Sequence, residues 1–202
     1  MGKIICIEGI SGSGKTTQIN FLYDFLSPDA AIIPEFNSFS PFKEVIEEWK
    51  KEAYKSQKIY FEKNDIIKFA KARRAVQKNI LQKVSGYNYL LADRSVYTSL
   101  VYEEGEVKIE EIEEINRLEG IIFPDEGFIL DCKPEEALSR IDKRREKEGL
   151  YRSRSIHETL EELKKRRELY LKLPEKYPGL HLLDSSEEEC GIFKKIKEIL
   201  RV

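Results

Sequence analysis

The sequence predicts an α/β fold in which a five-stranded, mainly parallel sheet lies between two layers of helices. Short apolar runs alternate along the chain with segments whose apolar residues recur every three or four positions, the spacing of one helix face. Runs that are apolar along their whole length are typical of parallel strands covered on both faces. The expected strands are 3–8, 30–33 (closed by Pro34), 87–92, 127–130 and 180–183.

The helices are expected between these strands. In the first of them, 15–26, apolar side chains return at Ile19 and Leu22. Pro134 is expected to begin a helix, because proline fits best in a first turn, and Pro174 is expected to stop a later one. The expected helices are 15–26, 42–55, 58–84, 108–119, a helix from Pro134, 155–172 and 187–201.

The bulk composition is that of a single folded domain, which we expect to span 1–202. The net charge of −2 gives no electrostatic reason to expect a nucleic-acid polymer as a partner. The three cysteines are far apart and form no C-x-x-C pair, so we interpret them as buried thiols in a reducing compartment. The sequence shows no signal-peptide pattern and no run of about 18 apolar residues, so we expect a cytoplasmic protein without membrane contact.

Residues 9–16 read Gly-Ile-Ser-Gly-Ser-Gly-Lys-Thr, a complete G-x-x-x-x-G-K-[ST] phosphate-binding loop. The loop falls between an expected strand and an expected helix, the context that this motif requires, and so predicts a P-loop NTPase fold. Its glycines let backbone N–H groups converge on phosphate oxygens, and the helix N-terminus adds a favourable dipole. We therefore expect the donor nucleoside triphosphate to bind at Gly9, Ile10, Ser11, Gly12, Ser13, Gly14, Lys15, Thr16 and Thr17.

Lys15, Thr16 and three carboxylates form the expected catalytic and metal site. Lys15 would reach the β- and γ-phosphates, and Thr16 would hold Mg²⁺. Glu8, Glu35 and Asp93 each follow or end an expected strand, and the carboxyl ends of parallel strands share one edge of the sheet. A carboxylate there can bind Mg²⁺ through water or accept a proton, so Thr16, Asp93 and Glu8 are candidate metal residues and Glu35 is a candidate catalytic one. The alternatives are a solvated loop acid for Glu35 and a helix N-cap for Asp93.

Arg94, Phe69 and Arg73 are candidates for binding a second substrate. Arg94 directly follows Asp93 and is placed to grip an anionic group bidentately; the alternative is an exposed arginine. Phe69 and Arg73 are four residues apart and share one helix face, where an aromatic ring and a guanidinium suit a base with a polar edge. Core packing is the alternative for Phe69.

A basic cluster containing a glycine follows the fourth expected strand. Such a segment near a phosphate-binding loop predicts a lid, at about 142–155, that closes over the transferring phosphoryl group, excludes water and supplies positive charge. The alternative is a solvated helix surface paired with glutamates. The cluster comprises Arg140, Lys143, Arg144, Arg145, Lys147, Arg152 and Arg154.

Taken in order, these segments resemble the thymidylate kinase family, within the wider group of P-loop nucleoside and nucleotide kinases. The resemblance covers nearly the whole chain. Residues 7–18 resemble the family's opening, and 69–73 resemble its F-x-x-x-R segment. Asp93-Arg94-Ser95, with Thr98 and Tyr102, resembles its D-R-Y-x-x-S-x-x-x-Y segment.

The resemblance implies roles for the substrate-binding residues. Phe69 would stack on thymine, Arg73 would contact the nucleotide and Arg94 would hold the acceptor phosphate. Tyr102 would lie by the sugar and disfavour a 2′-hydroxyl, with Thr98 beside it in the same segment. The resemblance also implies a homodimer.

The chain departs from the family pattern at several points. Pro34-Glu35 follows Ile33 where the family has Arg-Glu-Pro, Ser95 replaces the tyrosine of D-R-Y, and Glu103 stands where glutamine is common. Asp93-Arg94-Ser95 also resembles the E-R-S segment of deoxynucleoside kinases, in which a glutamate after strand two is the catalytic base. The loop has no basic residue before its lysine, so the resemblance implies that the catalytic arginine comes from the lid. The candidates are Arg144, Arg152 and Arg154.

These inferences predict phosphoryl transfer from ATP–Mg²⁺ to dTMP, giving dTDP. An acceptor phosphate needs little general base, since its second pKa is about 6, and Glu35 would then be positional. The alternative is a deoxynucleoside kinase in which Glu35 is the base for a 5′-hydroxyl. A third hypothesis, a non-catalytic nucleotide-binding or switch protein, is disfavoured by the acceptor-like residues and the basic lid.

Overall fold

Five parallel strands form the centre of the structure, a computed structural model that describes residues 2–56, 60–149 and 156–202. The strands lie in the order β2-β3-β1-β4-β5, so β1 is central. Every pairing is parallel, which confirms the predicted sheet. The strands are β1 (Lys3–Glu8), β2 (Ala30–Ile33), β3 (Tyr89–Asp93), β4 (Glu126–Asp131) and β5 (Leu180–Asp184).

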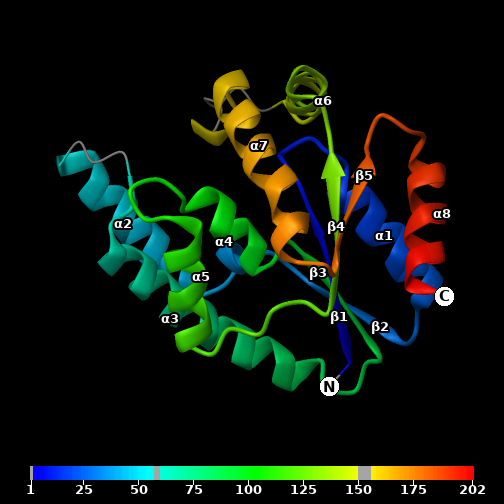
Figure 1. Cartoon of the computed structure of the whole chain (residues 1–202), viewed down its shortest axis with the longest axis horizontal. Coiled ribbons are helices and arrows are strands. Elements are labelled where there is room, and N and C mark those ends of the chain that lie inside the picture. Colours follow the sequence, from blue (N-terminus) through cyan, green and yellow to red (C-terminus); the bar gives the residue numbers. More distant parts are fainter. Residues whose placement is uncertain (1, 57–59, 150–155) are drawn as a thin grey trace.

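Helices cover both faces of this sheet, giving the three predicted layers (Figure 1). One face is covered by α1 (Lys15–Leu26) and α8 (Glu189–Leu200), which also pack on each other. The helices on the other side are α3 (Lys63–Lys83), α4 (Val96–Tyr102), α5 (Ile109–Leu118) and α7 (Leu160–Lys176), with α2 (Phe42–Ser56) packed outside against α3.

The unbroken apolar run at residues 4–7 of β1 follows from this layering. Successive side chains of a strand point to opposite faces of the sheet. Ile4 and Cys6 accordingly belong to the core under α3, α5 and α7, whereas Ile5 and Ile7 belong to the core under α1 and α8. A strand buried on both faces cannot alternate apolar and polar residues, because every position is inside.

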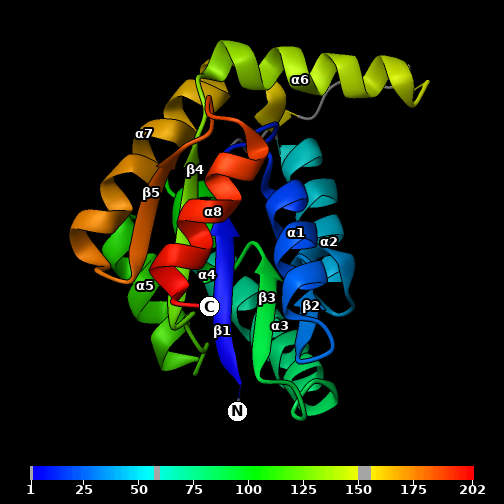
Figure 2. The ribbon, with the colours of Figure 1, turned by 90° about the vertical axis from the view of Figure 1, so that its right-hand side faces the viewer.

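The remaining long helix, α6 (Pro134–Lys147), lies across the carboxyl edge of the sheet (Figure 2). It begins directly after β4, with Pro134 in its first turn as predicted. It ends at Lys147, two residues before Gly149, whose φ of 63° lies in the left-handed region. The basic cluster therefore starts on a helix that projects over the strand ends.

Several expected boundaries are corrected by the structure. Pro174 does not stop its helix, which runs on to Lys176, because the packing of the buried stripe of α7 offsets the helical bond that the missing N–H removes. The backbone continues past it, and Tyr177 N still donates to the Leu173 carbonyl at 2.9 Å. The same helix begins at Leu160 and the expected helix 58–84 begins at Lys63, while 57–59 lie outside the described residues.

Among the described residues, none of the helices combines the length and the apolarity that a membrane crossing requires.

Candidate active site

The phosphate-binding loop joins β1 to α1 and is fixed by glycines with positive φ. Gly9 has φ 133° and Gly12 has φ 81°, conformations that other residues rarely adopt. A Cβ on Gly9 would lie 2.7 Å from the carbonyl oxygen of Leu130, and one on Gly12 would lie 2.4 Å from that of Ala137. The glycines thus let the loop pack directly on the end of β4 and the start of α6.

Lys15 lies folded back across this loop. It is 8% exposed, and its Nζ donates to the Ile10 carbonyl at 2.9 Å. Burial, together with the positive charge of Arg94, lowers the pKa of Lys15 to about 7, against the opposing effect of nearby carboxylates. A bound polyphosphate would supply the anion that favours the charged form of this lysine. In the same loop, Ser13 Oγ is buried and has no hydrogen-bond partner in the described part of the chain, which suits a ligand oxygen.

Thr16 and Asp93, two of the predicted metal residues, lie together. Thr16 Oγ1 donates to Asp93 Oδ2 across 3.4 Å, joining the start of α1 to the end of β3. One hydroxyl and one carboxylate fit Mg²⁺, which is usually held by few protein oxygens, water and substrate phosphates. The alternative of Asp93 as a helix cap is wrong, because Ser95 caps α4 and its Oγ accepts from Tyr97 N at 3.2 Å.

Glu8, the third predicted metal residue, is fully buried beneath the site. Its Oε1 accepts from Ser95 N at 2.7 Å and from Ser95 Oγ at 2.8 Å. Its Oε2 accepts from Thr98 Oγ1 at 2.7 Å and from Tyr170 OH at 3.1 Å. Burial raises the pKa of Glu8, while Arg94 and these donors counteract the rise. Because both oxygens already have protein donors, the geometry favours an internal anchor over a metal ligand.

Arg94 lies at the centre of the site, 11% exposed. Its backbone φ of 68° lies in the left-handed region, which costs a non-glycine residue about 1–2 kcal/mol and therefore indicates that its surroundings hold it there. Its Nη1 donates to the Gly9 carbonyl at 3.3 Å, so the residue touches the phosphate-binding loop. Burial opposes its charge, but Tyr102, Tyr170 and two glutamates raise the pKa of Arg94 above its ordinary value.

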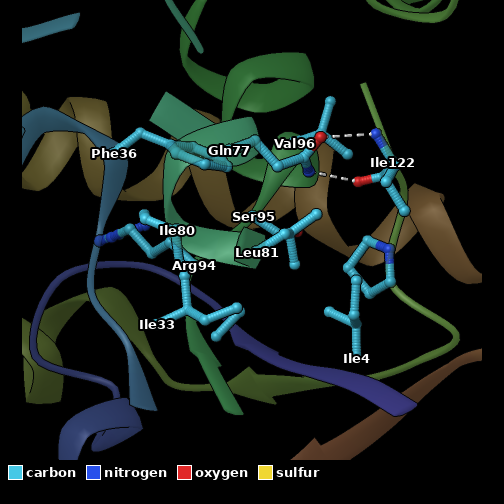
Figure 3. A pocket seen from close by; sticks show the side chains of 12 residues that line it. Ile4, Ile33, Phe36, Gln77, Ile80, Leu81, Arg94, Ser95, Val96 and Ile122 are labelled. Atoms are coloured by element: carbon cyan, nitrogen blue, oxygen red, sulfur yellow. Dashed lines mark hydrogen bonds between the residues drawn. The ribbon is translucent and has the colours of Figure 1, made fainter. Parts of the chain in front are cut away.

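Glu35 comes into the site from the loop after β2. Its Oε1 lies 3.0 Å from Arg94 Nε, and its side chain is 37% exposed. The alternative of a solvated loop acid therefore gives way to an ion pair at the sheet edge. Arg94 also borders a small hollow, drawn in Figure 3, that lies between the strand ends and α3. Across its far side, Gln77 exchanges two hydrogen bonds with the backbone of Ile122.

Phe69 and Arg73 are both buried, at 1% and 2% exposed. The Phe69 ring packs edge-on against Phe42, with ring centroids 6.2 Å apart. Arg73 lies with its guanidinium 5.1 Å from the centre of the same Phe42 ring and forms a 2.5 Å ion pair with Glu103. In this conformation Phe69 is a core residue, packed edge-on against both Phe42 and Phe61.

Thr98 and Tyr102 lie one turn apart on α4, beside Arg94. The Arg94 guanidinium is 5.3 Å and that of Arg166 is 5.0 Å from the centre of the Tyr102 ring. The Tyr102 hydroxyl is buried without a partner among the described residues. His157 packs edge-on against the ring at 5.3 Å. The structure thus brings both predicted substrate residues to the site.

Of the three candidates for the catalytic arginine of the lid, Arg144 lies within the described residues. It lies in the last turn of α6, half-exposed, and its Nη2 is 3.8 Å from Glu158. Arg152 and Arg154 lie outside the described residues. Both interpretations of the basic cluster, a lid and a solvated helix surface, therefore stay predictions.

The comparison with known proteins decides the family. A sequence model of the thymidylate kinase family matches residues 7–196. The chain belongs to the thymidylate kinase family. It is 31% identical to the thymidylate kinase of Thermoanaerobacter sp. strain X514, over 99% of this chain and 98% of the relative. It is 28% identical to the thymidylate kinase of Clostridium novyi strain NT, over 99% and 98% of the two chains.

A solved thymidylate kinase structure has the same fold. The crystal structure of the enzyme from Ehrlichia chaffeensis matches with a TM-score of 0.65 at 19% identity, covering 100% of this chain and 99% of the other. The predicted P-loop kinase fold and the resemblance read from the motifs are both confirmed.

The sequence motifs of the thymidylate kinase family did not point to two residues of this site. Tyr170 donates to Glu8 and lies 3.2 Å from Arg94 Nη1, and Arg166, 6% exposed, packs by Tyr102 and donates to the Val101 carbonyl. Both lie on the buried stripe of α7, where a tyrosine cannot be distinguished from ordinary core by spacing. The available signal was an arginine, four residues before Tyr170, that falls on the apolar spacing of the same helix face.

Proposed function

We propose that this chain transfers a phosphoryl group from ATP to dTMP, giving ADP and dTDP, with Mg²⁺ as the metal. The observation that carries the proposal is the placement of two largely buried cations at the phosphate-binding loop, where Lys15 donates to the Ile10 carbonyl and Arg94 to the Gly9 carbonyl. Lys15 follows β1 and Arg94 follows β3, and these strands are direct neighbours in the sheet. Transfer from one phosphate to another brings an anion to each side of the transferring group, so adjacent cations suit a donor and an acceptor phosphate. Family membership supports dTMP as that acceptor.

On the donor side, the loop amides and Lys15 would bind the β- and γ-phosphates of ATP. Thr16 and Asp93 would hold Mg²⁺, which neutralises phosphate charge when bound. Glu8 would not bind the metal in this proposal, because its oxygens serve Ser95, Thr98 and Tyr170. The positive φ values of the loop hold its backbone against β4 and α6, so little reorganisation would be needed on binding.

On the acceptor side, Arg94 would bind the phosphate of dTMP. Glu35 now pairs with Arg94 Nε, the position an acceptor phosphate would take, so it would be displaced when dTMP binds. An acceptor phosphate is mostly deprotonated at neutral pH and does not need Glu35 as a base. Glu35 would instead keep the guanidinium paired until the substrate arrives.

The base and sugar would lie between α3 and α4. Phe69 and Arg73 would meet the base once the Phe42 ring has moved from them, and Tyr102 with Thr98 would flank the sugar. The catalytic positive charge over the transferring group would come from Arg144, Arg152 and Arg154, in a lid of about 142–155. We further propose one kinase domain over 1–202, a homodimeric assembly and a cytoplasmic location.

The test is an acceptor panel that follows ADP release with ATP–Mg²⁺ and dTMP, dUMP, dCMP, thymidine or deoxycytidine. We expect turnover with dTMP, none with thymidine and none with dTMP after chelation of Mg²⁺. Turnover of thymidine without turnover of dTMP would refute the proposal in favour of a deoxynucleoside kinase. ATP binding without turnover of any acceptor would favour a non-catalytic nucleotide-binding protein.

Glu35→Gln separates the two kinases further. If the acceptor is a phosphate, the variant keeps kcat within about tenfold, because no proton has to be removed. If the acceptor is a hydroxyl, removal of the base lowers kcat by roughly a hundredfold or more.

A further inference from the structure

The hydroxyl of Tyr170 reaches the centre of the active site from α7, although the residue is 2% exposed. Its oxygen lies 3.1 Å from Glu8 Oε2, 3.2 Å from Thr98 Oγ1 and 3.2 Å from Arg94 Nη1. It therefore touches residues of β1, α4 and the turn after β3 at one point. No step of the proposed reaction requires it.

The direction of these hydrogen bonds follows from Glu8. An ionised carboxylate only accepts, so Thr98 and Tyr170 both give their protons to Oε2. Each hydroxyl oxygen is then left with lone pairs that face Arg94 Nη1, at 3.4 Å from Thr98 and 3.2 Å from Tyr170. Burial, and then Glu8, raise the pKa of Tyr170 far above its ordinary value, so its hydroxyl keeps the proton that this pattern needs.

The consequence for Arg94 is a guanidinium whose contacts with the protein interior are all made by Nη1. Its Nη1 is fixed by Gly9, Thr98 and Tyr170, whereas its Nε faces Glu35, and Nη2 has no hydrogen bond within the described residues. The Nε–Nη2 edge is one of the forks that bind a phosphate bidentately. The internal contacts therefore aim this edge at the place where Glu35 now lies.

We propose that Tyr170, with Glu8 behind it, is a positioning residue that orients Arg94 for the acceptor phosphate. The proposal rests on the proposed function, because it takes Arg94 to be the phosphate ligand. Tyr170 touches neither substrate in this assignment. It fixes the rotamer of the Arg94 guanidinium. The resulting gain in binding free energy is expected only for an acceptor that carries a phosphate.

Tyr170→Phe is the cleanest variant, since it removes one oxygen and leaves the buried ring. Tyr177→Phe is its matched control. Tyr177 lies at the end of the same helix, 8% exposed, and packs on Tyr97 with ring centroids 4.9 Å apart. Both variants delete a buried tyrosine hydroxyl, but only one of them borders Arg94.

The measurement is the dissociation constant of dTMP and of thymidine by calorimetry, with the KM for ATP as a further readout. For Tyr170→Phe we expect roughly tenfold weaker binding of dTMP, the effect of one charge-assisted hydrogen bond, and less than about twofold change for thymidine and for the ATP KM. Tyr177→Phe should leave all three unchanged. A general packing defect would instead weaken dTMP and thymidine equally, and that result, or unchanged dTMP binding, overturns the proposal.

Glu8→Gln tests the second half of the inference. An amide in place of the carboxylate can donate to the hydroxyls and turn their protons toward Arg94, so dTMP binding should weaken at least as much as in Tyr170→Phe. The double variant should then lose less than the sum, because both changes act on one guanidinium. If the losses of dTMP binding free energy in the two single variants add fully in the double variant, the role of Glu8 is overturned. If Glu8→Gln does not fold, the result for Tyr170→Phe decides the proposal. A wild-type protein that binds thymidine as tightly as dTMP refutes the phosphate role of Arg94, which separates failure of the proposed function from failure of this inference.

Discussion

The buried ion pair between Arg73 on α3 and Glu103 at the end of α4 leads to a quantitative stability prediction. Their side chains are 2% and 7% exposed and lie 2.5 Å apart. Glu103→Ala removes the anion and leaves the Arg73 charge buried, with Asn116 as its remaining hydrogen-bond partner. Breaking a buried pair from one side costs about 3–5 kcal/mol, because the desolvated charge is no longer compensated. For a chain of this length, a loss of about 3 kcal/mol lowers Tm by about 6–12 °C.

The assay is urea unfolding followed by circular dichroism, with Tm measured in parallel. Glu198→Ala is the control, since Glu198 and Lys194 form a 4.0 Å pair whose side chains are 64% and 78% exposed. Its removal should leave the free energy of unfolding unchanged within error. The loss of unfolding free energy in Glu103→Gln should lie between those of Glu103→Ala and Glu198→Ala, because glutamine keeps a hydrogen bond to Arg73 but loses the charge. A Glu103→Ala protein within about 1 kcal/mol of wild type would refute the reasoning, since Arg73 would then have to reach water or another anion.

Three further predictions concern the active site. Because burial lowers the pKa of Lys15 to about 7, the free protein at pH 8 holds this lysine mostly neutral, and ATP binding should take up close to one proton. Calorimetry in two buffers of different ionisation enthalpy measures this uptake, which should vanish at pH 6 and in Lys15→Met; equal uptake in the variant would contradict it. Phe42→Ala should lower the free energy of unfolding by about 3 kcal/mol and tighten dTMP binding several-fold, because the ring no longer packs against Phe69 and Arg73. Weaker dTMP binding would show that Phe42 belongs to the base site itself. Arg144→Ala should lower kcat by roughly tenfold to a thousandfold with little effect on ATP affinity, with Arg201→Ala as control, and wild-type turnover would place the catalytic charge elsewhere.

Local patterns in the sequence predicted most of the fold. Strands buried on both faces are visible as unbroken apolar runs, and the loop at 9–16 fixes its own strand–loop–helix context, so the sheet and α1 were predictable. The expectation that Pro174 ends its helix was wrong, because the packing of the buried stripe on α7 carries the backbone past the proline, and local sequence does not show that packing.

The sequence predicted the active-site residues that lie at the ends of neighbouring strands. It did not predict contacts that depend on how helices pack on the sheet or on one another. Thr16, Asp93 and Arg94 come together because β1 and β3 are neighbours. The burial of Glu8 was not predictable, because its donors come from α4 and α7, and neither pairing leaves a pattern in the sequence. The packing of Phe69 against Phe42 likewise depends on how α2 packs on α3.

The hydrogen bond between Glu8 and Tyr170 affects the order in which the active site can form during synthesis. These residues are 162 positions apart, whereas the whole phosphate-binding loop lies within the first 16 residues. A growing chain therefore contains every residue of the donor loop long before α7 emerges to complete the surroundings of Arg94. Contacts of such long sequence separation form late and slowly in folding. A chain that ends before α7 would keep the nucleotide-binding motif but lack the Tyr170 contact that we propose orients Arg94.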